Sequence, residues 1–321
     1  MSITSKPLPK PYIPAHKAQP EQSDDWQKRD DGYKLWILDL ADGPYMDYPM
    51  AVHFETLARC NAACDFCPYP TLERKGVRMT DELIDKVIRE LNDIPEEIPF
   101  QLCPHRVNEP FLDKRIFDYI PRINDELPNA DITIATNGSV LNDANLDRIA
   151  RFRKITYFNV SFNDHRKDEY QRVMQLDYDR TLDNLDRLHE RIASGVMDLP
   201  VRVSRVGDGS EADADFIKWC SARWPKFGAI CGPRENWFGK VVTKTLYSTP
   251  PMGCSQWFKI GFLPDGRETY CCFDEEGQHG VGSVADSHIL DVYNHPKRRA
   301  RRKKGLMRAD LDMCQGCQVR A

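Results

Sequence analysis

The chain has 321 residues, enough for one large enzyme domain with a small appendage or for two ordinary domains. It carries 45 lysines and arginines against 49 aspartates and glutamates, and the net charge of −4 argues against a dedicated nucleic-acid-binding protein. No apolar stretch reaches the roughly 18–20 residues that cross a bilayer, and residues 1–22 lack the apolar core of a secretion signal. We therefore expect a cytoplasmic protein that contacts neither membranes nor nucleic acids.

Residues 1–30 are expected to form a disordered or extended arm, because prolines are frequent there and apolar anchors are few. Residues 31–240 alternate short apolar segments with segments of helical periodicity, clearest over Thr80–Asn92 and Asp177–Ala193. The expected strands are Met50–Glu55, Ile98–Pro104, Asp131–Thr136, Ile155–Ser161, Pro200–Val206 and Phe227–Cys231. Six strand–helix repeats predict an α/β fold, a partial (β/α)6 TIM-like barrel with its chemistry at the carboxyl ends of the strands.

Residues 241–321 break this alternation and are expected to form a second, smaller domain of a β-hairpin and a helix. The hairpin is predicted from Trp257–Leu263 and Glu268–Phe273, with its turn at Asp265-Gly266. A helix then carries seven basic residues among the eight of Lys297–Lys304. Such a run is typical of a solvated helix face, although it could also contact an anionic partner.

Cysteine is the most informative residue type, with 11 copies in the chain. In a reducing compartment, cysteines favour metal or redox chemistry over disulfides. Most of them fall into two groups, an early one of Cys60, Cys64 and Cys67 and a late one of Cys254, Cys271, Cys272, Cys314 and Cys317. The others, which have no partner at an obvious spacing, are Cys103, Cys220 and Cys231.

The early group directly follows the first expected strand. Three thiolates at this spacing can hold three irons of a cubane cluster, which leaves the fourth iron open to a small chelating molecule. The alternatives are three unrelated buried thiols or a zinc loop, for which His53 is the only plausible fourth ligand. Strand context and spacing favour the iron–sulfur cluster.

The spacing Cys60-x3-Cys64-x2-Cys67, with the aromatic Phe66 before the last cysteine, resembles the signature of the radical S-adenosylmethionine (SAM) superfamily. The resemblance implies a [4Fe-4S] cluster whose open iron binds SAM. It also implies an external one-electron donor such as flavodoxin or ferredoxin. Reductive cleavage then gives methionine and a 5′-deoxyadenosyl radical, so the cofactor supplies the hard chemistry and the barrel positions it.

Later segments resemble the same family strand by strand. Glu109, in Asn108-Glu109-Pro110 where many members have Gly-Glu-Pro, is implied to accept hydrogen bonds from the SAM ammonium. The other implied contacts are Thr136 near SAM, Ser161 at the methionine part, Asn163 at the ribose and Arg202 at the carboxylate. Taken singly, these residues also fit a Glu-Pro loop, an Asn-Gly turn, a strand-end serine and a solvated arginine.

The late cysteines can supply four thiolates, which would close either a zinc site or a further iron–sulfur cluster. A cysteine before a hairpin, Gly266 followed five residues later by Cys271, and a downstream CxxC resemble the SPASM/Twitch extension of radical SAM enzymes. The resemblance implies one auxiliary [4Fe-4S] cluster, in the shorter Twitch form because the chain stops soon after the CxxC. Its implied ligands are Cys254, Cys271, Cys314 and Cys317, with Cys272 competing with Cys271.

The expected activity is abstraction of a hydrogen atom from a carbon of a small polar substrate. The resemblance implies relatives that oxidise or epimerise sugars and aminocyclitols and others that modify peptides, and the lack of an evident peptide-recognition domain favours a small molecule. Cys103 and Cys231 are candidate hydrogen donors, and His105, Arg106 and Arg205 are candidate proton acceptors. A zinc-stabilised binding protein that uses the basic helix as its contact surface is the alternative from another class.

Overall fold

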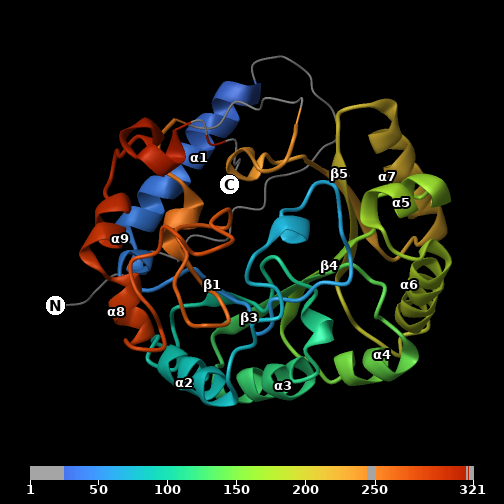
Figure 1. The fold of residues 1–321 in the computed structure, drawn as a ribbon, viewed down its shortest axis with the longest axis horizontal. Helices are drawn as coiled ribbons and strands as arrows, with labels where there is room; N and C mark the ends of the chain where they lie inside the picture. The colour runs from blue at the N-terminus through green and yellow to red at the C-terminus, as the bar shows by residue number, and fades with distance from the viewer. Residues whose placement is uncertain (1–24, 244–250, 316, 318–321) are drawn as a thin grey trace.

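The computed structural model describes residues 25–243, 251–315 and 317, which form one parallel β-sheet with helices outside it (Figure 1). The strands are β1 (Ala51–Phe54), β2 (Phe100–Cys103), β3 (Ala130–Thr136), β4 (Ile155–Ser161), β5 (Val201–Gly207), β6 (Gly228–Pro233) and β7 (Lys259–Phe262). They lie in the order β6-β5-β4-β3-β2-β1-β7, and each neighbouring pair is parallel. A sheet with two ends is open, so the fold is the predicted partial barrel.

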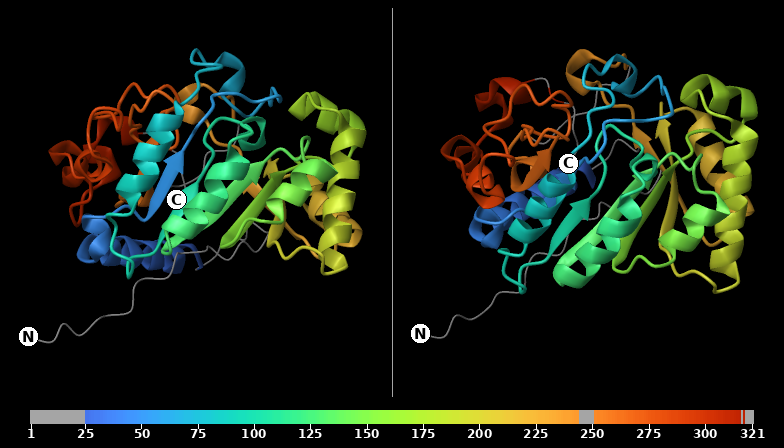
Figure 2. Two further views of the ribbon diagram at one scale, coloured as in Figure 1. Left: turned by 90° about the horizontal axis from the view of Figure 1, so that it is seen from below. Right: turned by 60° about the horizontal axis from the view of Figure 1, so that its bottom comes forward.

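Helices follow the strands and form an outer layer, which Figure 2 shows from two further directions. They are α1 (Asp25–Asp42), α2 (Asp81–Leu91), α3 (Ile116–Glu126), α4 (Asp143–Ile149), α5 (Lys167–Met174), α6 (Tyr178–Ala193), α7 (Glu211–Arg223), α8 (Ile289–Tyr293) and α9 (Pro296–Arg301). Side chains cap two of these helices, because the Thr80 hydroxyl accepts from the backbone N–H of Leu83 at 3.1 Å and the Asp177 carboxylate accepts from that of Arg180. None of the described helices is both long and apolar enough to cross a membrane.

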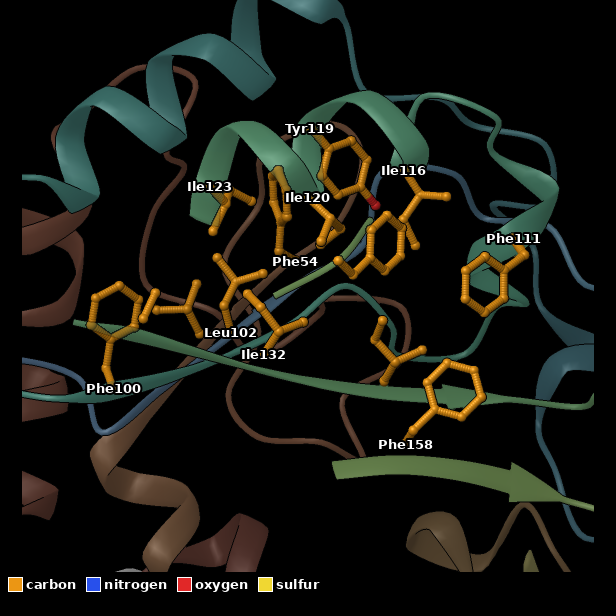
Figure 3. Close-up of a cluster of buried hydrophobic side chains, with 14 of the residues drawn as sticks. Phe54, Phe100, Leu102, Phe111, Ile116, Tyr119, Ile120, Ile123, Ile132 and Phe158 are labelled. Carbon is orange, nitrogen blue, oxygen red and sulfur yellow. The ribbon is translucent and has the colours of Figure 1, made fainter. Parts of the chain in front are cut away.

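The hydrophobic core lies between the outer face of the sheet and the helices (Figure 3). The labelled side chains there include Phe54, Leu102, Ile132 and Phe158 from the strands and Ile116, Tyr119, Ile120 and Ile123 from α3. Successive side chains of a strand point to opposite faces. The residues between these core positions therefore lie on the inner face of the sheet. Most of them are polar, namely His53, Gln101, Cys103, Thr133, Tyr157, Asn159, Ser161, Arg202 and Ser204, whereas Ala51, Ala135, Val206 and Ile230 are apolar.

Two expectations about the ends of the barrel need correction. The predicted arm over residues 1–30 is helical from Asp25 onward, while residues 1–24 lie outside the described part of the chain. Helix α1 is anchored by buried Ile37, Leu40 and Tyr33, and the Tyr33 hydroxyl accepts from the backbone N–H of Ser255 at 3.0 Å. The prediction of an arm is therefore wrong for residues 25–30.

The predicted hairpin turn is present, but its first arm belongs to the main sheet. β7 pairs in parallel with β1, with Ala51 opposite Lys259 and Phe54 opposite Phe262. After the turn, the returning arm forms an isolated antiparallel bridge at Glu268 and donates from the Thr269 N–H to the Gly261 carbonyl at 2.9 Å. The sheet therefore continues across the predicted domain boundary at residue 240, and the separate smaller domain remains a prediction.

The basic run 297–304 is not a solvated face, and this expectation is wrong for three of its arginines. Arg298, Arg301 and Arg302 are only 2%, 7% and 1% exposed. Arg298 pairs with buried Glu268, and Arg302 donates to the Tyr293 carbonyl at 3.1 Å. These three guanidinium groups are therefore unavailable to a partner, while Lys297, Arg299, Lys303 and Lys304 are exposed.

Candidate active site

The early cysteines lie in the loop that follows the carboxyl end of β1, as predicted. A turn joins two of them, with the Cys67 N–H donating to the Cys64 carbonyl at 3.2 Å. The loop rests on the end of α5, where the Ala63 N–H donates to the Met174 carbonyl at 3.2 Å and the Cys64 Sγ lies 3.5 Å from the Met174 Sδ. The end of a helix from the other half of the sheet thus positions the cysteine loop.

The three thiols form a mutually interacting donor set. Burial raises the pKa of Cys60 to about 12 and that of Cys67 to about 11, and it raises the pKa of Cys64 further, with the other two thiols contributing. Among the described residues, no three His, Cys, Asp or Glu side chains converge as ligands of a single metal ion would. Three cysteines in one short loop are the donor set of an iron–sulfur cluster.

Glu109 and Thr136 meet beside this loop. The buried Glu109 carboxylate accepts from the Thr136 hydroxyl at 2.8 Å and from the Asn137 N–H at 2.7 Å. Burial raises its pKa to about 7, against the lowering effect of these hydrogen bonds. The Asn137 side chain donates to the Asn61 amide oxygen at 2.8 Å, and Asn61 lies inside the cysteine motif. The end of β3 and Glu109 are therefore connected to the cysteine loop by direct hydrogen bonds.

Ser161 and Asn163 reach the same loop from the other side. Asn163 has a positive φ of 66°, and its amide donates to the Ser161 hydroxyl at 2.8 Å and to the Met174 Sδ at 3.0 Å. Its amide oxygen accepts from the Val206 N–H at 2.8 Å, which fixes the side chain to β5. Met174 also contacts Cys64, so Ser161 and Asn163 are connected to the cysteine loop through it. With Glu109 and Thr136, four of the predicted SAM-contacting residues therefore lie around one loop. No sequence signal pointed to Met174, while Asn61 and Asn137 could have been considered as neighbours of the predicted residues.

Two other predicted cofactor contacts stand apart from this network. Phe66 lies in the cysteine loop and packs, partly buried, against the hydrophobic core. Arg202 lies near the beginning of β5, opposite Asn159, and its guanidinium carbon is 5.1 Å from the centroid of the Tyr157 ring. Ser204 is the residue opposite Ser161, so Arg202 is two residues, about 6–7 Å, farther from the carboxyl end. The structure does not bring Arg202 to the cysteine loop.

The candidate catalytic residues divide between the two faces of the sheet. Cys103 lies on the inner face, with its Sγ 2.8 Å from the Thr133 hydroxyl. Cys231 and Arg205 instead face α7, because the Cys231 thiol approaches the Asp213 carbonyl at 3.4 Å and Arg205 pairs with the Asp213 carboxylate at 2.8 Å. Arg205 also pairs with Asp164 at 2.5 Å. Strand alternation accounts for the difference, since Arg205 shares the outward face of β5 with the core residues of that strand.

Two further candidate proton acceptors, His105 and Arg106, lie just after β2. The His105 Nδ1 accepts from the Ala135 N–H at 3.2 Å, which leaves the proton of the neutral ring on Nε2. Burial and the charge of Arg106 lower the pKa of His105 to about 4. His105 is therefore a hydrogen-bond donor at neutral pH. Arg106 donates from Nη2 to the Cys271 carbonyl at 3.1 Å, which links the end of β2 to the late cysteines.

The late cysteines gather where three separate segments meet. Cys254 precedes β7, Cys271 follows the returning arm, and a turn joins the last two, with the Cys317 N–H donating to the Cys314 carbonyl at 3.2 Å. Burial raises the pKa of Cys254 to about 11, with a contribution from the Cys317 thiol. A hydrogen bond that the Cys271 thiol donates to the adjacent Cys272, together with burial, raises the pKa of Cys271. The donor set fits an auxiliary cluster, and both adjacent cysteines remain available as its ligand.

Arginines surround this second set. The Arg308 guanidinium donates to the Gly253 carbonyl at 2.6 Å, and its charge opposes the effect of burial on the pKa of Cys254. Arg301 lies 3.7 Å from the centroid of the Tyr270 ring, and the Tyr270 hydroxyl is 3.4 Å from the Cys314 Sγ. Positive side chains therefore act directly on the late cysteines, whereas the arginines at the early loop, Arg172 and Arg234, pair with Asp65.

An open parallel barrel with three cysteines at the carboxyl end of its first strand and a four-cysteine set beside its last strand defines a class of iron–sulfur enzymes that cleave SAM. Comparison with protein families agrees with this assignment. The profile of the radical SAM superfamily matches residues 54–216, and that of the SPASM iron–sulfur cluster-binding domain matches residues 254–318. The chain belongs to the radical SAM superfamily and carries a C-terminal SPASM domain, which implies SAM, a [4Fe-4S] cluster and auxiliary iron–sulfur binding.

Several solved structures share this fold. BtrN in complex with AdoMet and 2-DOIA is 15% identical with a TM-score of 0.54, and the match covers 84% of this chain and 93% of BtrN. Streptococcus suis SuiB bound to the precursor peptide SuiA is 13% identical with a TM-score of 0.62 (90% of this chain, 75% of SuiB). AnSMEcpe with bound AdoMet is 12% identical with a TM-score of 0.56 (78% and 82%). At such identities only the fold is shared, and a search of curated proteins finds no match.

Proposed function

We propose that this radical SAM enzyme abstracts a hydrogen atom from a carbon of a small polar substrate, a sugar or aminocyclitol, and thereby oxidises or epimerises it. The observation that carries the proposal is the polar inner face of the sheet. Hydroxyl, amide, imidazole and phenol groups line it, those of His53, Gln101, Tyr157, Asn159 and Ser204. A purely structural barrel would place branched apolar residues there. Such groups suit a substrate rich in hydroxyls. The fold of BtrN, which was solved with 2-DOIA, supports the same substrate class.

The residues around the early loop fit the cofactor that the family implies. Cys60, Cys64 and Cys67 would hold the cluster, whose chemistry when loaded is the reductive cleavage of SAM with an electron from an external donor. Glu109 presents a buried carboxylate beside Cys60, as a partner for an ammonium group requires. The Ser161 hydroxyl lies within the same network through Asn163 and is placed for a polar part of SAM. These side chains would orient SAM, while the packed loop keeps water away from the reacting atoms.

Oxidation and epimerisation make different demands on the protein. Oxidation removes one hydrogen atom, one proton and one further electron from the substrate, and a loaded four-cysteine site would supply a one-electron acceptor. Epimerisation returns a hydrogen atom to the opposite face of the carbon and needs a donor such as a thiol. Cys103 is the candidate donor that lies on the inner face, whereas Cys231 faces α7. The two outcomes are therefore both compatible with this inner face, and oxidation draws support from the SPASM domain.

The test is a product assay with anaerobically reconstituted protein, a strong reductant, SAM and a panel of sugars and aminocyclitols in deuterated water. An oxidised product formed together with 5′-deoxyadenosine supports oxidation. Deuterium at an inverted carbon, without oxidised product, supports epimerisation, and Cys103→Ala should then abolish the inversion. Failure to form any 5′-deoxyadenosine under reducing conditions would contradict the proposed chemistry altogether.

Peptide modification is the second candidate. It is favoured by the likeness in fold to SuiB, which was solved with a precursor peptide, and to anSMEcpe. The same assay, run with peptides in place of sugars and read by mass spectrometry, distinguishes this candidate. A peptide that alone stimulates 5′-deoxyadenosine formation would replace the small-molecule proposal.

A further inference from the structure

One side of the inner face carries positive charge. The register of the sheet places Lys259 and Gly261 of β7 beside Ala51 and His53 of β1, and His53 beside Cys103 of β2. The alternate residues of β7, Ile260 and Phe262, belong to the hydrophobic core. Since side chains alternate along a strand, the half-buried Lys259 extends from the inner face, on the same side as His53.

The ammonium group of Lys259 has no ion-pair partner among the described residues. Within residues 25–243, 251–315 and 317, neither a carboxylate nor a carbonyl lies within ion-pair or hydrogen-bond distance of it. A half-buried ammonium ordinarily finds such a partner, because removing it from water is unfavourable. The position therefore suits an ammonium that meets its partner only when a ligand is bound.

Arg106 brings a second positive charge to the same region. Its Nη2 donates to two backbone carbonyls, those of Cys271 at 3.1 Å and Asp274 at 3.4 Å, so no carboxylate among the described residues neutralises it directly. Its Nε is buried and has no hydrogen-bond partner in the described part of the chain, and the same holds for the side-chain amide nitrogen of Asn108. Gly261 makes this arrangement possible, since a Cβ there would lie 2.2 Å from the Arg106 Nη1.

The electrostatics of the neighbouring histidines are consistent with an uncompensated positive region. Burial, followed by the charges of Lys259 and Arg106, lowers the pKa of His53 well below its usual range. Two carboxylates also belong to this surrounding: Glu55, which is paired with Arg74 at 2.5 Å, and Glu235, whose charge acts on Cys272. The Cys272 thiol lies there too, and a hydrogen bond from Cys271 and the charges of Lys259 and Arg106 lower its pKa. The Glu55–Arg74 pair is internally neutral. Two cations and two unused donors therefore face the region, and both histidines are uncharged there.

We infer that the substrate carries an anionic group, a carboxylate or a phosphate, which Lys259 and Arg106 bind at the β7 side of the inner face. The inference rests on the proposed function, because it names the substrate class of the same site. An anion would give the Lys259 ammonium its missing partner and would supply acceptors to the Arg106 Nε and the Asn108 amide. Sugar acids and sugar phosphates combine such a group with the hydroxyls that the rest of the inner face can bind.

The test is calorimetric binding to the full-length, anaerobically reconstituted protein with saturating SAM and no reductant. The probes are glucuronate, glucose 6-phosphate, glucose and glucosamine, which differ in charge on a common ring, and inorganic phosphate alone. At least one anionic sugar should bind about tenfold or more tightly than glucose, as expected for a charge-assisted contact. Preference for glucuronate would identify a carboxylate ligand, and preference for glucose 6-phosphate a phosphate ligand.

Lys259→Met should reduce the affinity for the preferred anionic probe about tenfold and leave SAM affinity within about twofold. The matched control is Lys218→Met, which removes the same charge from an exposed position on α7. Iron content and thermal midpoint establish that both variants are folded and loaded. Any one of four results would overturn the inference. Two concern the parent protein: equal binding of glucose and the anionic sugars, or no binding of any anionic probe. Two concern the variants: equal affinities of Lys259→Met and Lys218→Met for the anionic probe, or a large loss of SAM affinity in Lys259→Met.

This experiment separates the inference from the proposed function. Binding without reductant is independent of SAM cleavage, so an anionic preference can be found even if no oxidised or inverted product forms. Conversely, a product assay that succeeds with a neutral sugar would retain the proposed function and reject the anionic substrate.

Discussion

The two cysteine sites hold the same kind of ligand in different electrostatic surroundings. Around the early loop, the side chains in contact are the amides of Asn61 and Asn137 and the thioether of Met174. The charges that act on the three thiols are carboxylates, those of Glu109, Asp65, Glu275 and Glu55, while Arg172 and Arg234 pair with Asp65. Around the late set, Arg308 acts on Cys254 and Arg301 acts on Cys314 and Cys271. The early site is thus neutral to acidic, and the late site is basic.

The difference in surrounding charge matches the charge of the group that each site is expected to bind. A cluster with four thiolate ligands carries negative charge, and buried guanidinium groups offset it and raise its reduction potential. A three-cysteine site is completed by SAM, which brings its own sulfonium and ammonium groups. Acidic and neutral surroundings suit that cation, whereas arginines would repel it. We therefore propose, independently of the cysteine spacing, that the early loop is the SAM site and the late set the auxiliary site.

The largest expected effect separates the two sites by function. Cys60→Ala should reduce 5′-deoxyadenosine formation at least about 1,000-fold, because the SAM-binding cluster loses a ligand, and iron should fall from about eight to about four per chain. Cys314→Ala should remove a similar amount of iron but retain SAM cleavage. Iron analysis and chromatography of 5′-deoxyadenosine provide the measurements. If Cys314→Ala abolished SAM cleavage and Cys60→Ala did not, the assignment of the sites would be reversed.

The next effect concerns the buried ion pair between Arg298 and Glu268, which lies near the late cysteines. Arg298→Ala should lower the free energy of unfolding by about 3–5 kcal/mol, because it leaves the carboxylate of Glu268 buried without its partner. Arg299→Ala, which breaks an exposed pair with Asp47, is the control and should cost less than about 1 kcal/mol. Denaturant unfolding of the cluster-free proteins measures both values. Similar losses in the two variants would show that the buried pair is not a main support.

The early site should respond to pH through Glu109. Its pKa is raised to about 7 in the folded protein, so between its ordinary value and 7 the folded state binds a proton that the unfolded state has lost. This contribution destabilises the fold as pH rises through that window and is constant above it. Relative to the parent, cluster-free Glu109→Gln should therefore gain up to roughly 3 kcal/mol of stability between pH 5 and pH 8.

Unfolding curves at several pH values test this expectation, with Glu97→Gln at an exposed position as the control. A stability difference between Glu109→Gln and the parent that does not change with pH would mean that Glu109 remains ionised throughout. In the loaded enzyme the same variant should weaken SAM binding, since it removes the carboxylate offered to the ammonium group.

The smallest effect tests the connection between the sites. In Gly261→Ala the new methyl group displaces the end of the flexible Arg106 side chain, so the unfolding free energy should change by less than about 1 kcal/mol. The hydrogen bond from Arg106 to the Cys271 carbonyl should nevertheless be lost, and binding of anionic sugars should weaken severalfold. Gly282→Ala, where a Cβ meets Val292 only at ordinary contact distance of 3.8 Å, is the control. Unchanged sugar binding in Gly261→Ala would place Arg106 outside the substrate region.

Much of the barrel was predictable, because its signals are local. Apolar alternation located the six strands of the repeats, and capping residues such as Thr80 located helix starts. The meeting of Glu109 and Thr136 also follows from sequence, since the carboxyl ends of neighbouring parallel strands lie at one edge of a sheet. The outward position of Arg205 could have been found as well, from its alternation with the inward Ser204.

The remaining features depend on partners that are distant in the chain. A run of arginines has the same local pattern whether it faces water or, like Arg298, a buried glutamate from another segment. The helical start at Asp25 is stabilised by contacts of α1 with the segment around Ser255. A hairpin turn shows where a strand ends but not which sheet edge it joins, so the pairing of β7 with β1 could not be read from the turn.

That pairing has a consequence for biosynthesis. β1 lies near the start of the chain and its neighbour β7 in the last quarter, so the edge of β1 stays open while the ribosome makes nearly everything between them. An unpaired edge with apolar Val52 and Phe54 is a template for association between nascent chains. Chaperone co-expression should therefore increase the yield of soluble protein, and fragments ending before β7 should aggregate.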